Sequence, residues 1–246
     1  DDYRFVYHGS ALTIGEATQH IESLEIASEA VYGDAALQVD ASASSDLPVS
    51  LVSSNPEVLE VNGAQLKILG AGTAVITARQ GGSANYDAAP DVNATVVIHK
   101  AELEVVAHPA SKAYLDENPE LSFHYEGFVN EDNATDLNEE PIVSTTATQS
   151  SVAGVYDVNA SGGEDENYHF VYHGSALTIG EAVQHIDALE IATEAVYGDA
   201  ALQLDASATS DLPVNFVSSN PEVLEVNGTQ LKILGAGTAV ITARQG

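Results

Sequence analysis

The sequence predicts an all-β protein made of tandem domains, and three observations lead to this prediction. Residues 1–81 return as residues 166–246 with 12 differences, so that Tyr3 corresponds to Tyr168 and the period is 165 residues (168 − 3). Self-similarity at a fixed period indicates a repeat array, and a period of this length suits two domains of roughly 80 residues. Short strand-like stretches separated by turn residues about every 8–12 positions are typical of a β-sandwich.

The clearest hairpin begins at Val58. Two apolar runs, Val58–Val61 and Leu66–Leu69, flank Asn62-Gly63, and an Asn-Gly pair supplies the positive φ angles of a tight turn. Gly70-Ala71-Gly72 predicts a second turn.

A half-buried strand follows this turn. Here apolar and other residues alternate with a period of two, as Ala74, Ile76 and Ala78 do with Val75, Thr77 and Arg79. Further strands are expected at Ala36–Ala41, Pro48–Val52 and Asn93–His99.

The charge balance excludes several partners. Acidic side chains number 37 against 7 Lys and Arg, which gives a formal net charge of −30. Nucleic acid and anionic membranes both need a basic face, so we expect neither as a partner. Two interpretations fit the acidity. One is a solvating surface for high salt, where screening removes most self-repulsion, and the other is a surface that binds divalent cations through carboxylate oxygens.

The composition also limits the chemistry. The chain has no Cys, which excludes disulfides, thiolate metal sites and a cysteine nucleophile. No run reaches the roughly 18 apolar residues of a membrane helix, and residues 1–20 lack the features of a signal peptide. Any targeting or anchoring segment is therefore expected outside these residues. With 44% hydrophobic residues the chain can still bury a core.

Several motifs resemble the bacterial immunoglobulin-like (Ig-like) domains of surface adhesins. They are Ser53-Ser54-Asn55-Pro56-Glu57-Val58, Val61-Asn62-Gly63 and Gly70-Ala71-Gly72-Thr73-Ala74-Val75-Ile76-Thr77-Ala78, with Tyr32-Gly33-Asp34, Leu47-Pro48-Val49 and Ala84-Asn85-Tyr86-Asp87-Ala88-Ala89 around them. The resemblance spans residues 17–100 and recurs over residues 182–246. It implies an Ig-like β-sandwich in each span and gives little information about a ligand.

Residues 101–181 resemble the MBG repeat, a glycine-rich, mostly-β domain found beside Ig-like domains in large bacterial surface proteins. The motifs are Leu121-Ser122-Phe123, Gly127-Phe128-Val129, Ser144-Thr145-Thr146-Ala147, Gly154-Val155-Tyr156, Asn167-Tyr168 and Gly174-Ser175-Ala176-Leu177-Thr178-Ile179. The resemblance makes residues 1–16 the C-terminal tail of a preceding MBG-like domain. Tyr114-Leu115-Asp116 departs from the Tyr-Gly that these repeats often carry, which leaves the first turn open.

The second Ig-like span stops before the counterpart of Gly82–His99. We therefore expect residues 182–246 to form a domain that is incomplete at its C-terminus, with a bare sheet edge or core face. The simplest explanation is a window on a longer repetitive chain. Strand donation between molecules is the alternative, although this sequence holds no spare copy of the missing segment.

Two acidic loops are candidate calcium sites. Residues 130–136 and 164–167 bring side-chain oxygens together at short spacing, and Ca²⁺ takes about 6–8 oxygen ligands. The candidate ligands are Asp132, Asp136, Glu164 and Asp165. Neither loop matches an EF-hand or a nonapeptide calcium repeat, and clusters also arise by composition alone, so a solvated acidic loop is the alternative. No other cofactor is implied.

Four sequons permit N-glycosylation, at Asn93, Asn133, Asn159 and Asn227. Asn227 corresponds to Asn62, where Ala64 removes the sequon, which favours chance occurrence. Histidines recur as His8 with His173 and as His20 with His185, but without the close spacing that zinc needs.

No catalytic motif is found. The sequence contains no Gly-x-Ser-x-Gly elbow, no His-Glu-x-x-His and no phosphate-binding glycine loop. The near-identity of the two repeat copies also argues against a unique active site, so we do not expect an enzyme.

The array and the resemblances predict a structural repeat segment of a long extracellular or cell-surface protein, forming a stiff adhesin stalk or filament. The expected partners are further copies of the repeat in the same chain, with lateral self-assembly into fibres as an option. The expected junctions, Gly15-Glu16-Ala17 and His99-Lys100-Ala101, lack the composition of flexible linkers.

The alternative is a binding module in which one domain face recognises glycan or a surface protein. Its candidate residues are Tyr3, Tyr7, Tyr168 and Tyr172, which recur at i, i+4 and so share one face of a strand. The same tyrosines could equally belong to a core.

Overall fold

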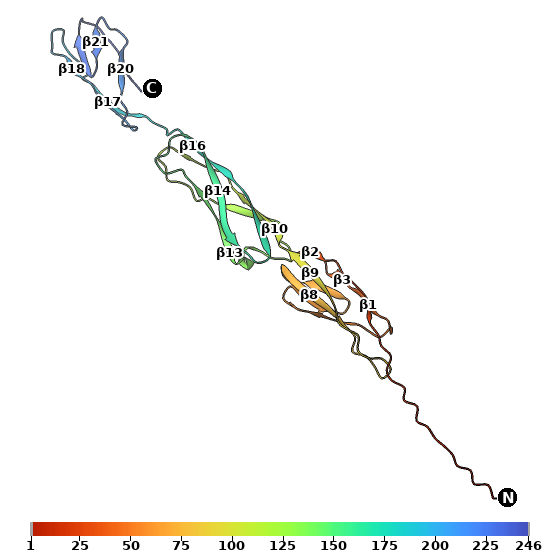
Figure 1. Cartoon of the computed structure of the whole chain (residues 1–246). Helices are drawn as coiled ribbons and strands as arrows, with labels where there is room; N and C mark the ends of the chain where they lie inside the picture. The colour runs from red at the N-terminus through yellow and green to blue at the C-terminus, as the bar shows by residue number, and fades with distance from the viewer. Residues whose placement is uncertain (1, 246) are drawn as a thin grey trace. The chain divides into compact units, whose positions relative to one another are not determined.

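The computed structural model describes residues 2–245. Asp1, the first residue of the expected domain 1–16, and Gly246, the last residue of the expected domain 182–246, lie outside the described residues. The described chain contains 23 strands and one 3₁₀ turn, so the predicted all-β class is confirmed (Figure 1). It divides into two compact units. One comprises the residues up to Lys112 with Asp116–Ile179, and the other comprises Ala113–Leu115 with the residues from Gly180 onward. Within residues 2–245, no helix is long and apolar enough to cross a membrane.

The described chain begins with an extended segment. Residues 2–16 form no strand and are exposed, and Figure 1 shows them as a trace that leaves the first strands. The segment ends where Ala17 makes a parallel bridge with Tyr86.

Two facing sheets form residues 17–100, called here the first β-segment. One sheet has the strand order β2-β9-β8-β5, the other has the order β3-β7-β6, and β1 pairs with β4 beside them. Neighbouring strands are antiparallel except β2 and β9, which are parallel. The strands are β1 (Ile21–Glu25), β2 (Glu29–Val31), β3 (Leu37–Gln38), β4 (Asp40–Ala43), β5 (Ser50–Ser53), β6 (Leu59–Asn62), β7 (Gln65–Ile68), β8 (Gly72–Arg79) and β9 (Val92–His99).

The core of this segment lies between its two sheets. On β8, Ala74, Ile76 and Ala78 are at most 1% exposed, as the alternation of the sequence predicts for a strand with one buried face. Leu59 and Leu66 of the facing sheet are fully buried and, together with Ala74 and Ile76, belong to one hydrophobic cluster.

The expected hairpin forms, but its turn lies one residue later than predicted. Asn62 pairs with Gln65 within the ladder of β6 and β7, so the two-residue loop is Gly63-Ala64. Of these residues only Gly63 has a positive φ, 63°. A single positive φ at the first loop position corresponds to a type II′ turn, in which glycine is needed there alone.

The other expected strands are found with one change. Asn93–His99 lies within β9, and Pro48–Val52 overlaps β5. The stretch Ala36–Ala41 is split at Val39 into β3 and β4, which join different sheets. The Val39 amide instead donates to the carbonyl of Ala64 at 2.9 Å.

Residues 101–179, the middle β-segment, also form two sheets. Their strand orders are β12-β10-β15 and β11-β16-β14-β13, and β10 is parallel to β15. Leu103, Val105, Val158 and Leu177 are fully buried. The elements are β10 (Ala101–Ala107), β11 (Ala110–Ala113), β12 (Phe123–Glu126), the 3₁₀ turn η1 (Ala134–Asp136), β13 (Glu139–Thr145), β14 (Gly154–Glu164), β15 (Tyr168–His173) and β16 (Ser175–Gly180).

Residues 180–245, the last β-segment, repeat the pairings of the first β-segment. The pair Leu59↔Ile68, for example, returns as Leu224↔Ile233. Within the described residues this segment has no counterpart of β2 or β9. Its strands are β17 (Ile186–Glu190), β18 (Leu202–Gln203), β19 (Asp205–Ala208), β20 (Asn215–Ser218), β21 (Leu224–Asn227), β22 (Gln230–Ile233) and β23 (Ile241–Arg244).

Candidate functional site at the junction of two β-segments

A single residue connects the first and middle β-segments. β9 ends at His99 and β10 begins at Ala101, so only Lys100 lies between them. The Lys100 ammonium donates to the carbonyl oxygen of Asp165 at 2.7 Å, and the Ala101 amide donates to that of Asn167 at 2.9 Å. A connection this short, hydrogen-bonded to the 165–167 loop of the middle β-segment, limits bending at this point.

One hydrophobic core runs through both segments. Tyr32, Leu59 and Ile98 of the first β-segment belong to the same buried cluster as Leu103 and Tyr168 of the middle β-segment. Buried apolar surface contributes about 25 cal/mol per Å², so separating the two segments would expose area that stabilises both. Apart from residues 113–115, the two segments accordingly belong to one compact unit.

A carboxylate joins one tyrosine from each segment. Tyr32 and Tyr168 both donate their hydroxyl hydrogen to Asp132 Oδ2, at 3.0 and 2.7 Å. The two rings meet edge to face with centroids 5.6 Å apart. The Tyr168 hydroxyl also accepts the Val129 amide at 3.0 Å. Hydrogen bonds to a charged group contribute about 1.5–3 kcal/mol each, so this trio adds directional stability to the shared core.

Both tyrosines are held in the neutral form. Burial raises the pKa of Tyr168, and the neighbouring Asp132 carboxylate raises it further. Burial is also the main cause that raises the pKa of Tyr32. A neutral phenol keeps the hydrogen that Asp132 accepts, so these bonds persist at neutral pH.

Glycines permit the close approach of the two segments. A Cβ on Gly33, whose φ is 97°, would lie 2.7 Å from Cβ of Val129. A Cβ on Gly70 would lie 3.3 Å from Oδ1 of Asn167, and the same oxygen accepts the Ala71 amide at 2.8 Å. Two of the motifs that resemble Ig-like domains, the one around Gly33 and the one that begins at Gly70, therefore lie at the junction.

A row of aromatic rings continues from the junction into the middle β-segment. Neighbouring ring centroids are 5.6, 5.5, 5.2 and 5.2 Å apart along the row Tyr32, Tyr168, Phe128, Tyr125 and Phe123. Such pairs contribute about 0.5–1.5 kcal/mol each beyond their buried area. Burial raises the pKa of Tyr125 to about 12, with a smaller effect from Glu140.

Asp165, a predicted calcium ligand, organises the loop below the junction. Its side chain is buried, with 6% exposed. Oδ1 accepts the amides of Asn167 and Tyr168 at 2.7 and 2.9 Å, and Oδ2 accepts the Asn138 amide at 3.2 Å. These bonds position Asn167 and Tyr168 for their contacts with the first β-segment.

The remaining predicted calcium ligands do not converge with it. Asp132 accepts the two tyrosine hydroxyls, and Asp136 accepts the Asn133 amide at 2.9 Å. Glu164 is exposed and lies opposite Glu139 in the sheet. Across residues 2–245, no group of three or more His, Asp or Glu side chains is arranged to hold a metal ion. Calcium binding therefore stays a prediction.

All four sequon asparagines are exposed. Asn133 caps η1, and its side-chain nitrogen donates to Asp136 at 2.7 Å, so a glycan there would displace a bond. Asn93 accepts the Thr77 hydroxyl at 2.7 Å. Asn159 and Asn227 lie in strands β14 and β21. Glycosylation also stays a prediction.

The repeated histidines contact carboxylates rather than each other. His173 Nε2 lies 3.2 Å from Glu104, and His185 Nε2 lies 3.0 Å from Asp187, while His8 and His20 are exposed.

A further histidine pair was missed by the sequence reasoning. His108 Nε2 is 2.8 Å from His124 Nδ1, and the rings stack with centroids 4.9 Å apart. The contact depends on the pairing of β10 with β12, which spacing along the sequence does not reveal.

The four tyrosines proposed as a binding face have different environments. Tyr168 is 3% exposed in the junction, and Tyr172 is 38% exposed with its hydroxyl donating to the Gly162 carbonyl. Tyr3 and Tyr7 are 86% and 92% exposed. In the middle β-segment, therefore, Tyr168 belongs to the core and Tyr172 is hydrogen-bonded within its own domain.

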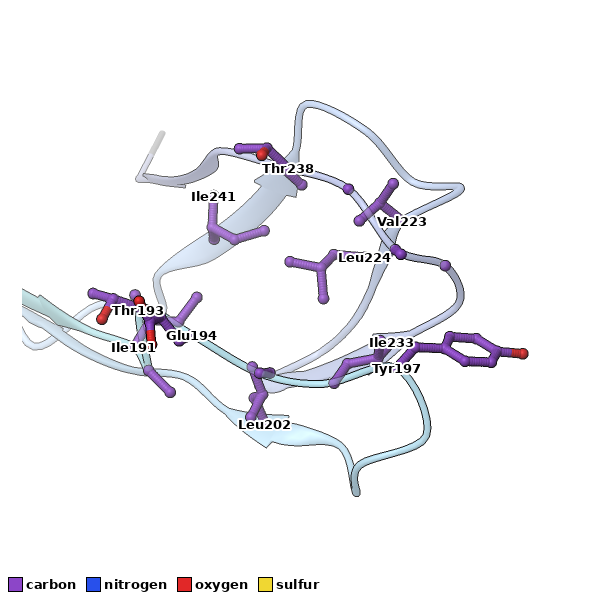
Figure 2. A pocket seen from close by; sticks show the side chains of 16 residues that line it. Ile191, Thr193, Glu194, Tyr197, Leu202, Val223, Leu224, Ile233, Thr238 and Ile241 are labelled. Carbon is purple, nitrogen blue, oxygen red and sulfur yellow. The ribbon is translucent and has the colours of Figure 1, made fainter.

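The last β-segment contains an open cavity of about 410 Å³. Figure 2 shows Leu224 projecting into it from β21, while the Tyr197 ring extends away from it. In the first β-segment, β9 covers the corresponding residues; Leu59, the counterpart of Leu224, is fully buried there. The cavity is lined by Ile191, Ala192, Thr193, Glu194, Ala195, Tyr197, Leu202, Val223, Leu224, Ile233, Gly235, Ala236, Gly237, Thr238, Ala239 and Ile241.

Comparison with known proteins gives one domain-level match. Residues 103–178 match the family model described as "MBG domain (YGX type)". The middle β-segment is similar to MBG domains. In this segment Leu115 follows Tyr114 and has a φ of 72°, the left-handed conformation that glycine adopts without steric cost. The departure from Tyr-Gly therefore changes the residue and keeps the backbone conformation that glycine favours.

Two solved structures are distant neighbours. The surface layer protein SbsC, domains 1–6, has a TM-score of 0.26 and 12% identity, over 91% of this chain and 36% of that chain. Drosophila N-cadherin EC1-4 has a TM-score of 0.24 and 12% identity, over 92% and 70%. TM-scores this low do not define a common fold, and the chain spans about a third of the SbsC chain. No curated protein matches the chain in sequence.

Proposed function

We propose that this chain is a structural repeat segment of a long extracellular or cell-surface protein, in which Ig-like and MBG-like domains alternate to form a stiff adhesin stalk or filament. The observation that carries the proposal is the core shared by Tyr32 and Leu59 with Leu103 and Tyr168. A repeat array gains length with each copy, and it transmits force along that length only if its junctions resist bending. Its role is mechanical and includes no catalytic step.

The MBG match supports the alternation, because it identifies a second domain type between two copies of the first sequence. The one-residue connection at Lys100 supports the stiffness. It excludes the flexible-coil regime of a longer Gly/Ser linker.

Stiffness can be measured as a distance distribution. The chain has no cysteine, so the double variant Ala64→Cys with Ser150→Cys places two spin labels, one in each segment, at exposed loop positions. We expect a narrow distribution in this protein and a broader one when Asp132→Ala is added. Asp157→Ala is the matched control, because it removes an exposed carboxylate of β14 away from the junction. A broad distribution without Asp132→Ala would overturn the proposed stiffness.

A separate experiment tests the proposed extracellular or cell-surface location. Antibodies raised against residues 1–246 should label intact cells of the source organism. Labelling that requires lysis of the cells would contradict an extracellular or surface role.

A further inference from the structure

One edge strand of the middle β-segment is open to pairing. β13 (Glu139–Thr145) ends the sheet β11-β16-β14-β13 and pairs only with β14 among the described strands. An edge strand presents a row of unpaired amide and carbonyl groups that a further strand can match. Seven residues are enough for several ladder bonds.

From Pro141 onward, this edge belongs to the longest uncharged run of the chain. Residues 141–156 contain no Asp, Glu, Lys or Arg, and this 16-residue run is the longest of its kind in the sequence. Elsewhere, 37 acidic side chains give a net charge of −30. Two molecules of the chain therefore repel each other least where their β13 edges meet.

Apolar side chains are exposed beside the edge. Ile142 is 64% exposed on β13, and Val155 is 72% exposed on β14. Ile142 lies opposite Ser161, which shares a strand face with Val155 because side chains alternate along β14. Val152, in the loop before β14, is 68% exposed.

Two other edge strands of the same unit carry features that oppose further pairing. β5 (Ser50–Ser53) has four residues and stands between Pro48 and Pro56, and short edges flanked by proline resist further pairing. β12 carries His124 and Glu126 in a hydrogen-bonded ion pair at 3.1 Å. β13 also contains one proline, Pro141, but it has three more residues than β5, and the four residues beyond Pro141 are uncharged.

We propose that β13 pairs in antiparallel orientation with β13 of a second molecule of this chain. Any antiparallel register centred on residues 142–144 sets Glu139 and Glu140 opposite uncharged residues, whereas a parallel register sets them opposite their own counterparts. Like charges directly opposite destabilise a sheet, so the two-fold antiparallel arrangement is favoured. The pairing goes beyond the stalk function and does not need a stiff junction.

Sedimentation equilibrium of the full chain tests the pairing, with protein that carries no glycan at Asn159, the neighbour of Ser144 in the sheet. We expect a monomer–dimer equilibrium that tightens as salt is raised from 0.02 to 0.5 M, because screening weakens the repulsion between two acidic chains. Ser144→Glu should raise the dimer dissociation constant about tenfold or more, because it adds repulsion on both strands. Ser50→Glu on β5 adds the same charge and should leave the constant unchanged.

Three results would overturn the proposal. They are a chain that stays monomeric up to about 0.5 mM at 0.5 M salt, a Ser144→Glu variant that dimerises like the parent, and equal weakening by Ser50→Glu. These outcomes leave the spin-label test of the stalk unaffected.

Single-cysteine variants test the geometry. Paired residues in an antiparallel ladder have Cα atoms about 4.5–5.5 Å apart, within the range of about 4.4–6.8 Å that a disulfide spans. Of the three variants Ile142→Cys, Val143→Cys and Ser144→Cys, the one at the centre of the register should therefore form a covalent dimer at least ten times faster than Ser50→Cys under the same oxidant. Equal rates would exclude the proposed edge pairing.

Discussion

The two repeat copies show how much burial depends on neighbours rather than on sequence. Tyr32 is 7% exposed and its counterpart Tyr197 is 69% exposed, although both stand in the sequence Glu-Ala-Val-Tyr-Gly-Asp. Tyr32 contacts the middle β-segment through Asp132 and Tyr168, whereas Tyr197 is an exposed side chain of the last β-segment. The same local sequence is therefore a junction in one place and an open surface in the other.

The difference arises where parts of the chain cover the first copy but not the second: β9, the middle β-segment and the loop around Asp87, which accepts a hydrogen bond from the buried Gln19 while its counterpart Gln184 is exposed. Leu66 and its counterpart Leu231 are both fully buried, because β6 and β7 have their partners in both copies. For Tyr3 and Tyr168 the buried copy is the later one in the chain: Tyr3 is 86% exposed and Tyr168 is 3% exposed. Each pair provides a built-in control for substitutions.

The largest expected effect comes from truncating the paired tyrosines. Tyr32→Ala should lower the free energy of unfolding of the first and middle β-segments by about 3–5 kcal/mol, the usual cost for a buried aromatic side chain. Tyr197→Ala should change it by less than about 0.5 kcal/mol, as for an exposed side chain. Native-state hydrogen exchange with mass spectrometry measures both in the full chain, because Val39/Leu204 and Leu51/Phe216 distinguish peptides of the two copies. Similar losses in both variants would contradict the role assigned to the junction.

The paired glycines separate steric clash from backbone strain. Gly33 and Gly198 have φ angles of 97° and 100°, but only at Gly33 would a Cβ meet Val129, at 2.7 Å; nothing lies within 4 Å of a Cβ at Gly198. Gly33→Ala and Gly198→Ala therefore share the strain, and Gly33→Ala should cost about 1–3 kcal/mol more. Equal costs by the same exchange measurement would show that the segments separate without penalty.

Alkaline titration should next distinguish the middle β-segment from the last β-segment. Burial raises the pKa of Tyr125 to about 12, above the value of about 10 in an unfolded chain. The neutral phenol therefore stabilises the fold fully below about pH 10, and this contribution is lost as the pH rises toward 12. Exchange in residues 101–179 should accelerate across this window, together with a rise in phenolate absorbance. Tyr197, the tyrosine of the last β-segment, is 69% exposed, so amide exchange in that segment should stay unchanged across this window; simultaneous opening of both segments would refute the assignment.

The smallest effect should be the same in both copies. Asp46 and Asp211 have φ angles of 57° and 56°, a conformation that glycine adopts with less strain. Asp46→Gly and Asp211→Gly should each raise local stability by under about 1 kcal/mol, because the turn does not depend on neighbouring segments. A clear difference between the two changes in local stability, measured by exchange of the flanking amides, would mean that contacts outside each copy affect the turns.

Much of the fold could be predicted from local pattern. The alternation at Ala74, Ile76 and Ala78 predicted β8, because side chains of a strand point to opposite faces. The turn at Gly63 was misplaced by one residue, since Asn62 joined the ladder with Gln65. Val39 interrupts an expected strand because its amide bonds to Ala64 rather than to a neighbouring strand. Such choices depend on partners far along the chain.

The candidate site was predicted less well. Asp132 was predicted as a calcium ligand, whereas its acceptance of two tyrosine hydroxyls needs Tyr32 from 100 positions away. Composition does not distinguish Asp132 from the other acidic residues, because the chain has 37 of them. The useful signal was the pair Tyr32-Gly33, since a glycine beside an aromatic residue can indicate a close approach of backbone.

The sequence by itself determined the repeat, the all-β class, the absence of disulfides and the strongly acidic surface, because these follow from residue identity and from the local period of two. The tertiary structure alone decided which copy of each tyrosine is buried, which carboxylate joins two segments and which strand is left at an edge. Burial and hydrogen bonding are properties of a residue together with its neighbours. Two identical stretches of sequence therefore differ when different strands cover them.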